Sequence, residues 1–130
     1  MNKIYKYLEG KVYYLATSSI NGSPRVRPFA TIYYYKDNLY ILTKSSKNVG
    51  IEILKNKQIS ISTMSNDGSF IIIQCCVVKC LDNLIIKRIC NKYKEYHYNC
   101  DSEDTLVLKL TNGIATIYNE DRTKSEIIIA

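Results

Sequence analysis

The amino-acid sequence predicts a mostly β domain with interspersed helices, in which six or seven antiparallel strands close into a small barrel. Two observations favour this fold. Runs of β-branched and aromatic residues recur along the chain, separated by turn sequences such as Asn-Gly and Asp-Gly, and only three stretches have the apolar spacing of a helix. Strands in this order would leave long edges in an open sheet, so closure is expected, with helices across the ends or gaps.

The beginning of the chain predicts a short helix followed by a three-stranded meander. The helix is expected over residues 2–9, because its apolar side chains share one face and Gly10 can end it. Strong β formers and intervening turn residues predict three strands, over residues 12–18, 25–35 and 39–43.

Two further helices interrupt the strands that follow. A helix over residues 47–55 has Ser46 as its expected N-cap, and a helix over residues 83–98 begins after Asp82. A hairpin turn is expected at Asn112-Gly113. Period-two alternation and β propensity predict the remaining strands, over residues 58–65, 69–81, 105–110 and 114–118, and a tail at 127–129 that could add one more.

Length and composition predict one globular domain over residues 1–130. The chain is 46% hydrophobic and 23% charged, which excludes a disordered or low-complexity protein. No apolar run reaches the 18 or more residues of a membrane span, and the N-terminus lacks the apolar core of a secretory signal. We therefore expect a cytoplasmic protein without a membrane partner.

The charge of the chain is positive, with 18 Lys and Arg against 12 Asp and Glu, a net +6. This balance suggests an anionic ligand. Alternatively, the abundance of Lys, Ile, Asn and Tyr reflects the codon bias of an AT-rich genome, which would account for the positive charge without a ligand. A basic helix and an aromatic RNA-binding strand motif are both missing, so we expect no nucleic-acid partner.

The five cysteines and the single histidine do not have the spacing of a metal site. We expect no metal, no disulfide and mostly buried, reduced thiols. His97 has no evident catalytic partner, so a structural or exposed role is expected for it. No side chain is distinguished as an acid, base or nucleophile, and the catalytic residues stay unassigned.

Two polar segments are candidates for anion binding. Arg25 and Arg27 share one face of a strand that Pro28 interrupts, which suits bidentate anion binding or, alternatively, a solvated strand face with a bulge. Residues 43–48 place hydroxyls and lysines before a helix, which suits phosphate or, alternatively, simple capping. If residues 25–35 and 39–43 pair as a hairpin, both segments meet in one phosphate site.

The same segments resemble a known family. The runs Asn21-Gly22-Ser23-Pro24-Arg25-Val26-Arg27-Pro28-Phe29 and Leu42-Thr43 with Lys47-Asn48-Val49 are similar to the pyridoxamine 5′-phosphate oxidase-like FMN-binding split-barrel family. The chain looks most like its short members related to general stress proteins. The resemblance implies a split β-barrel homodimer with two FMN sites at the interface.

The resemblance also implies which residues bind the cofactor. Arg27, Pro28 and Phe29 would line the flavin, and Arg25 would belong to the same patch. The phosphate and ribityl end would lie on Thr43, Lys44, Ser46, Lys47 and Asn48. Gly50 stands where relatives commonly carry a bulkier residue, and Phe70, Ile72 and Cys75 stand where close relatives carry a larger aromatic, an Arg and a Gly.

The function that follows is an FMN-dependent oxidoreductase, in which the flavin transfers a hydride or electrons between an unidentified donor and a small-molecule substrate. True pyridoxamine-phosphate oxidase activity is not expected, because the chain ends before the segment those enzymes place on their substrate. Two alternatives stay open: a non-catalytic protein that binds FMN or another phosphorylated ligand, and a dimeric split barrel without cofactor.

Overall fold

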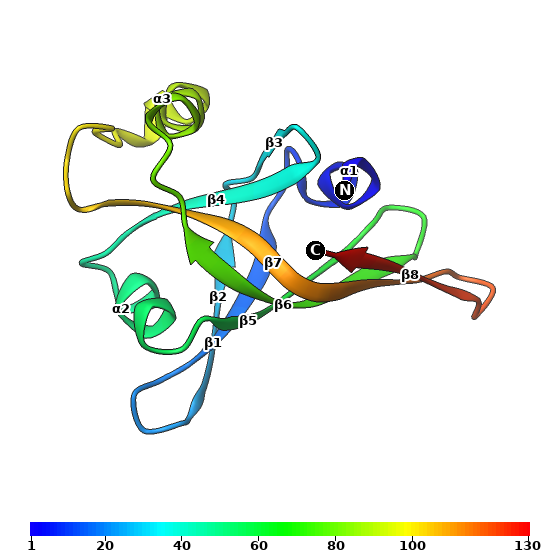
Figure 1. Cartoon of the computed structure of the whole chain (residues 1–130). Coiled ribbons are helices and arrows are strands. Elements are labelled where there is room, and N and C mark those ends of the chain that lie inside the picture. The colour runs from blue at the N-terminus through cyan, green and yellow to red at the C-terminus, as the bar shows by residue number, and fades with distance from the viewer.

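The computed structural model describes residues 1–130 and contains one antiparallel sheet with helices at its margins (Figure 1). The sheet has eight strands in the order β2-β1-β5-β6-β7-β4-β3, with β8 also paired to β7. The fold is therefore a mostly β split barrel, as the sequence predicts, with one strand more than expected. The strands are β1 (Tyr13–Ser18), β2 (Pro24–Phe29), β3 (Tyr33–Tyr35), β4 (Asn38–Lys44), β5 (Gln58–Met64), β6 (Phe70–Lys79), β7 (Thr105–Tyr118) and β8 (Lys124–Ile129).

The helices bury one face each against this sheet. They are α1 (Asn2–Leu8), α2 (Asn48–Lys55) and α3 (Asn83–Lys92), followed by the 3-10 turn η1 (Lys94–Tyr96). Ile4 and Leu8 of α1 and Ile53 of α2 enter the main core, which also takes the inward side chains of the strands, while α3 packs on a smaller core cluster that includes Tyr40. None of the helices has the length and apolar character that crossing a membrane requires.

The strand predicted over residues 25–35 is divided in two. The first half, β2, pairs with β1, whereas the second half, β3, pairs with β4. β2 and β3 therefore lie at opposite ends of the strand order. Between them residues 30–32 leave the ladder, and side chains bond the backbone of Thr31 and Ile32. Tyr13 donates to the Thr31 carbonyl at 2.5 Å, and the Tyr93 hydroxyl accepts from the Ile32 amide at 2.8 Å. This crossing segment joins the two edges of the sheet.

The hairpin predicted at Asn112-Gly113 is wrong, because β7 runs through it as one strand of 14 residues. The pair forms a bulge instead. Asn112 has φ 47°, and the register against β6 shifts between Gln74 and Cys76. A Cβ on Gly113 would lie 2.2 Å from the Gln74 carbonyl oxygen, so only glycine permits this approach. The last hairpin instead joins β7 to β8, a longer strand than the predicted tail.

Two helix ends also differ from expectation. Ser46 is not the N-cap of α2; Lys47 occupies that position and no side chain caps the helix. Asp82 is the predicted cap of α3 and accepts from the Leu84 amide at 2.9 Å. However, α3 ends at Lys92 rather than near residue 98, and the chain reverses at exposed His97, whose φ is 61°.

Candidate functional site

A pocket of about 210 Å³ lies where the chain between β2 and β3 faces the connection from β4 to α2. Five of the nine predicted cofactor-binding residues line it, namely Arg27, Pro28, Phe29, Thr43 and Lys47. The other lining residues are Ala30, Thr31, Leu42, Val49, Tyr96 and Tyr98. The pocket therefore combines an apolar and aromatic wall with two cationic side chains.

The route that brings these segments together is not the predicted hairpin. β2 has no ladder to β4, so pairing does not place Arg27 beside Thr43. Instead the hydroxyl of Thr31 donates to the Leu42 carbonyl at 2.9 Å and accepts from the Leu42 amide at 3.0 Å. This buried side chain replaces a strand-to-strand contact and holds the two halves of the pocket together.

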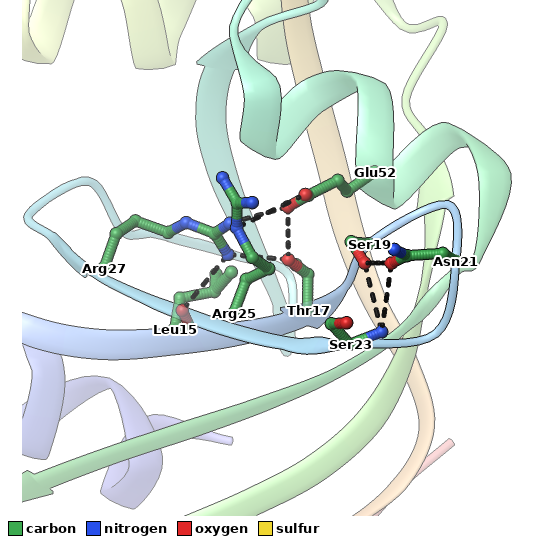
Figure 2. Close-up of polar contacts among 8 residues, drawn as sticks. All are labelled: Leu15, Thr17, Ser19, Asn21, Ser23, Arg25, Arg27 and Glu52. Carbon is green, nitrogen blue, oxygen red and sulfur yellow. Dashed lines mark hydrogen bonds and ion pairs between the residues drawn. The ribbon is translucent and has the colours of Figure 1, made fainter.

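Arg25 and Arg27 share one face of β2, as predicted, and both point at Glu52 of α2 (Figure 2). Arg27 Nη2 lies 2.7 Å from Glu52 Oε1, and Arg25 Nε lies 3.6 Å from Glu52 Oε2. Thr17 on β1 also donates to Oε1, at 2.8 Å. The Thr17 hydrogen bond and the two arginines hold the pKa of the Glu52 carboxyl below its ordinary value.

The second nitrogen of the Arg27 guanidinium is also engaged inside the chain. Nη1 donates to the Thr17 hydroxyl at 2.7 Å and to the Leu15 carbonyl at 3.3 Å. Glu52 was not predicted as part of the site, although an acidic residue on the apolar face of a predicted helix was a signal that it has a buried partner. Its carboxylate neutralises part of the charge that the two arginines were expected to offer an anion.

A second pocket, of about 460 Å³, takes two more of the predicted residues. Arg25 and Asn48 line it together with Glu52 and the turn that joins β1 to β2. Arg25 is 48% exposed there, whereas Arg27 is 20% exposed. The two arginines therefore serve neighbouring pockets, with Glu52 between them.

Lys44 and Ser46, the remaining predicted residues, line neither pocket. The Ser46 hydroxyl donates a hydrogen bond to Asp104 Oδ2 at 2.8 Å, and the Ser46 amide donates one to Asp104 Oδ1 at 2.8 Å. Ser45 also donates to Asp104, and these bonds lower the pKa of the Asp104 carboxyl. A carboxylate of the chain itself therefore occupies the donors that the sequence assigned to a phosphate. Lys44 lies over the ring of Tyr98.

The structure explains why a glycine, rather than a bulkier residue, occupies position 50. A Cβ at this position would lie 2.2 Å from the carbonyl oxygen of Lys44. The second residue after the start of α2 thus packs directly on the end of β4, which sets the helix beside the pocket. A bulkier residue here would require that the connection between β4 and α2 be displaced.

The cysteines lie away from both pockets, and all five are free. Burial raises the pKa of the Cys75 thiol to about 12 and also raises the pKa values of Cys80 and Cys90. The prediction that the thiols are mostly buried is confirmed for Cys75 and Cys90, whereas Cys76, Cys80 and Cys100 are only half-buried. The low reactivity of the buried thiols stays a prediction.

Comparison with known proteins identifies relatives by structure. No family model and no curated protein matches the sequence. A NimC/NimA family protein from Clostridium acetobutylicum superposes with a TM-score of 0.89 at 26% identity, over 98% of this chain and 90% of that one. A protein related to general stress protein 26, of the pyridoxinephosphate oxidase family and also from C. acetobutylicum, gives 0.74 at 15% identity, over 98% and 91%. General Stress Protein 26 from Bacillus anthracis gives 0.72 at 17% identity, over 97% of both chains.

Proposed function

Because this chain has the split-barrel fold of the pyridoxamine 5′-phosphate oxidase-like family, as its sequence predicts, we propose that it binds a flavin and that this flavin is FMN. The bound flavin would supply hydride or electron transfer to a small-molecule substrate, which would make the protein an oxidoreductase. We propose the cytoplasm as its location. The observation that carries the proposal is the pocket with an aromatic and apolar wall and Lys47 and Arg27 at its margin.

The residues present fit such a cofactor. Pro28, Phe29, Leu42 and Val49 give the pocket the apolar surface that a flavin ring requires. Lys47 precedes the first turn of α2, whose amides no side chain caps, and both the ammonium and the helix N-terminus favour an anion such as a phosphate monoester. We propose that the chain holds the ring at the crossing segment and the phosphate towards α2.

The size of the pocket supports a homodimer with sites at the interface. Its volume of about 210 Å³ is below the roughly 300–1,000 Å³ of ligand pockets, which is the result expected if a second copy completes the flavin site. The outward face of the sheet supplies a surface for a second copy. It exposes uncharged side chains on six strands, namely Tyr14, Val26, Met64, Ile72, Ile114 and Ile128. Sedimentation should give a dimer, and a 15.0 kDa species alone at micromolar concentration would contradict this.

The experiment that tests flavin binding starts from the absorbance spectrum of the purified protein. Structural neighbours include a protein described as an F420 reductase and a heme binding protein from Mycobacterium smegmatis, so the spectrum must distinguish flavin, deazaflavin and haem. Titration of FMN into the protein should quench the flavin fluorescence. Lys47→Ala should weaken FMN about tenfold, since a charge-assisted hydrogen bond contributes roughly 1.5–3 kcal/mol.

A matched control comes from the same helix. Lys55→Ala removes an exposed lysine at the other end of α2 and should leave FMN affinity unchanged. A wild-type protein that binds no FMN, or equal losses in the two variants, would overturn the assignment. Oxidation of NADH or NADPH by the FMN-loaded protein separates an enzyme from a non-catalytic binding protein, and turnover is the result we expect.

A further inference from the structure

We infer that Tyr98 is a positioning residue that holds Lys47, in the pocket lining, and Lys44, beside the pocket, as a pair of cations for the ligand phosphate, and that this pair, which takes part in no ion pair, attracts the phosphate more strongly than the two arginines do. The inference rests on the proposed function and deepens it. The Nζ atoms of Lys44 and Lys47 lie 5.6 Å and 5.8 Å from the centroid of the Tyr98 ring. Both distances are within the range of cation–π attraction.

The ring itself is fixed by the fold. α3 stops at Lys92, η1 follows, and the left-handed backbone of His97 turns the chain so that Tyr98 reaches the pocket. Tyr98 is half-buried against the smaller core cluster, which includes Tyr40 and Cys90. A side chain anchored in this way can orient two long, flexible lysines that would otherwise sample many rotamers.

The charge of this pair remains available. None of the four ion pairs of the chain includes either lysine. Asp104 is near enough to Lys44 for the lysine to lower its pKa, so the carboxylate offsets part of the Lys44 charge, but its oxygens are held by Ser45 and Ser46 and form no ion pair with the lysine. An aromatic ring attracts a cation without cancelling its charge, whereas a carboxylate cancels it.

The arginines are in the opposite situation. Both guanidiniums of β2 point at the buried carboxylate of Glu52. The Nη1 group of Arg27 also donates hydrogen bonds to Thr17 and Leu15. A phosphate that approached Arg27 would meet Glu52 within the same cluster and be repelled by it. The lysine pair therefore has the larger share of the attraction for an anionic group.

The test compares two ligands that differ only in the phosphate group. FMN and riboflavin are titrated into the wild-type protein, Tyr98→Phe and Tyr98→Leu. If the ring positions the lysines, Tyr98→Leu lowers the ratio of FMN to riboflavin affinity roughly fivefold or more, because two lysines must then be ordered on binding. Tyr98→Phe keeps the ratio, since a phenyl ring also attracts cations. Tyr98→Leu with an unchanged ratio, or Tyr98→Phe with an equal loss, would overturn the inference.

A second measurement needs no ligand and separates this inference from the proposed function. In NMR spectra of the ligand-free protein, the ε-methylene signals of Lys44 and Lys47 should be displaced upfield by the ring. The displacement should persist in Tyr98→Phe and vanish in Tyr98→Leu. Signals at ordinary lysine positions in the wild-type protein would refute the role of Tyr98 even if FMN binds. A wild-type protein that has the displacement but binds neither flavin would instead refute the proposed function.

Discussion

The carboxylate of Glu52 accepts a hydrogen bond from Arg27 at 2.7 Å, and this pair joins helix α2 to strand β2 at the margin of the candidate pocket. Both side chains are largely withdrawn from solvent, at 8% and 20% exposure. Arg27 is therefore a residue of the fold as much as of the site, which the sequence did not indicate. Loss of the Arg27 side chain and loss of the Lys47 side chain are therefore expected to differ in their effect on stability.

Arg27→Ala should destabilise the protein, whereas Lys47→Ala should leave the free energy of unfolding nearly unchanged. The first substitution leaves Glu52 without its closest cationic partner, and removal of one member of a buried pair is strongly unfavourable. Lys47 is exposed and takes part in no ion pair. Urea denaturation of both variants measures the difference, and equal stability of the two would contradict the structural role of Arg27.

The stability of the protein should fall in acid partly because of Glu52. Its pKa is lowered in the folded state, so its contribution is complete above the pKa of the unfolded chain and is lost as pH falls through the folded pKa. Glu52→Gln should therefore show a smaller fall in the thermal midpoint between about pH 6 and pH 3 than the wild type. Glu126→Gln, at an exposed acid, is the matched control. A fall as steep in Glu52→Gln as in the wild type would refute this.

Tyr93→Phe should destabilise the protein by about 1–3 kcal/mol. The Tyr93 hydroxyl accepts from the Ile32 amide at 2.8 Å and donates to the Ile32 carbonyl at 2.9 Å, so its loss leaves a buried amide without a partner. Tyr96→Phe provides the control, because Tyr96 is half exposed. Chemical denaturation gives both values; a change below a few tenths of a kcal/mol in Tyr93→Phe would count against the crossing segment being held in this way.

Gly50→Ala should cost about 1–3 kcal/mol, although alanine is the better helix former. The added Cβ would lie 2.2 Å from the Lys44 carbonyl oxygen, so backbone must move. Lys55→Ala on the same helix should change stability little, since that lysine is exposed. Equal stability of Gly50→Ala and the wild type would contradict the close approach of α2 to the Lys44 carbonyl.

Alkylation should distinguish the buried thiols from the rest. At pH 8 in the folded protein, Cys75, Cys80 and Cys90 should react slowly, because burial raises their pKa values, that of Cys75 to about 12. At most one thiol of the folded protein is expected to react rapidly, and all five should react after denaturation without reductant. Mass spectrometry of each peptide identifies the modified cysteine. Rapid labelling of Cys75 would be the contrary result.

Local patterns predicted most of the strands and helices, because each depends on a few neighbouring residues. The limits of β5 and β6 follow the alternation of apolar residues, and Asp82 begins α3 as an N-cap should. The errors arise where distant residues decide. Asn112-Gly113 has the composition of a hairpin turn, but the close approach of Gln74 on β6 makes it a bulge.

The sequence predicted several residues of the candidate site, but it did not predict the contacts that those residues make. Resemblance placed Arg27, Thr43 and Lys47 in one site, and one pocket does contain them. The expectation that Ser46 was free for a phosphate depended on local sequence, whereas Asp104, 58 residues later, binds it. Tyr98 was missed because it was predicted to be the last residue of the helix over 83–98, whereas the observed helix ends at Lys92 and Tyr98 follows the left-handed turn at His97 and lines the pocket.

The long strand β7 makes the order of synthesis important for this protein. β7 pairs with β6, β4 and β8, yet it is not made until residues 105–118. Before then β4 has only the three-residue β3 as a ladder partner, and the outer edge of β6 is uncovered. A ribosome-bound chain that ends at residue 104 therefore cannot close the barrel, and its apolar strands remain open to chaperones and to other nascent chains until residues 105–118 emerge.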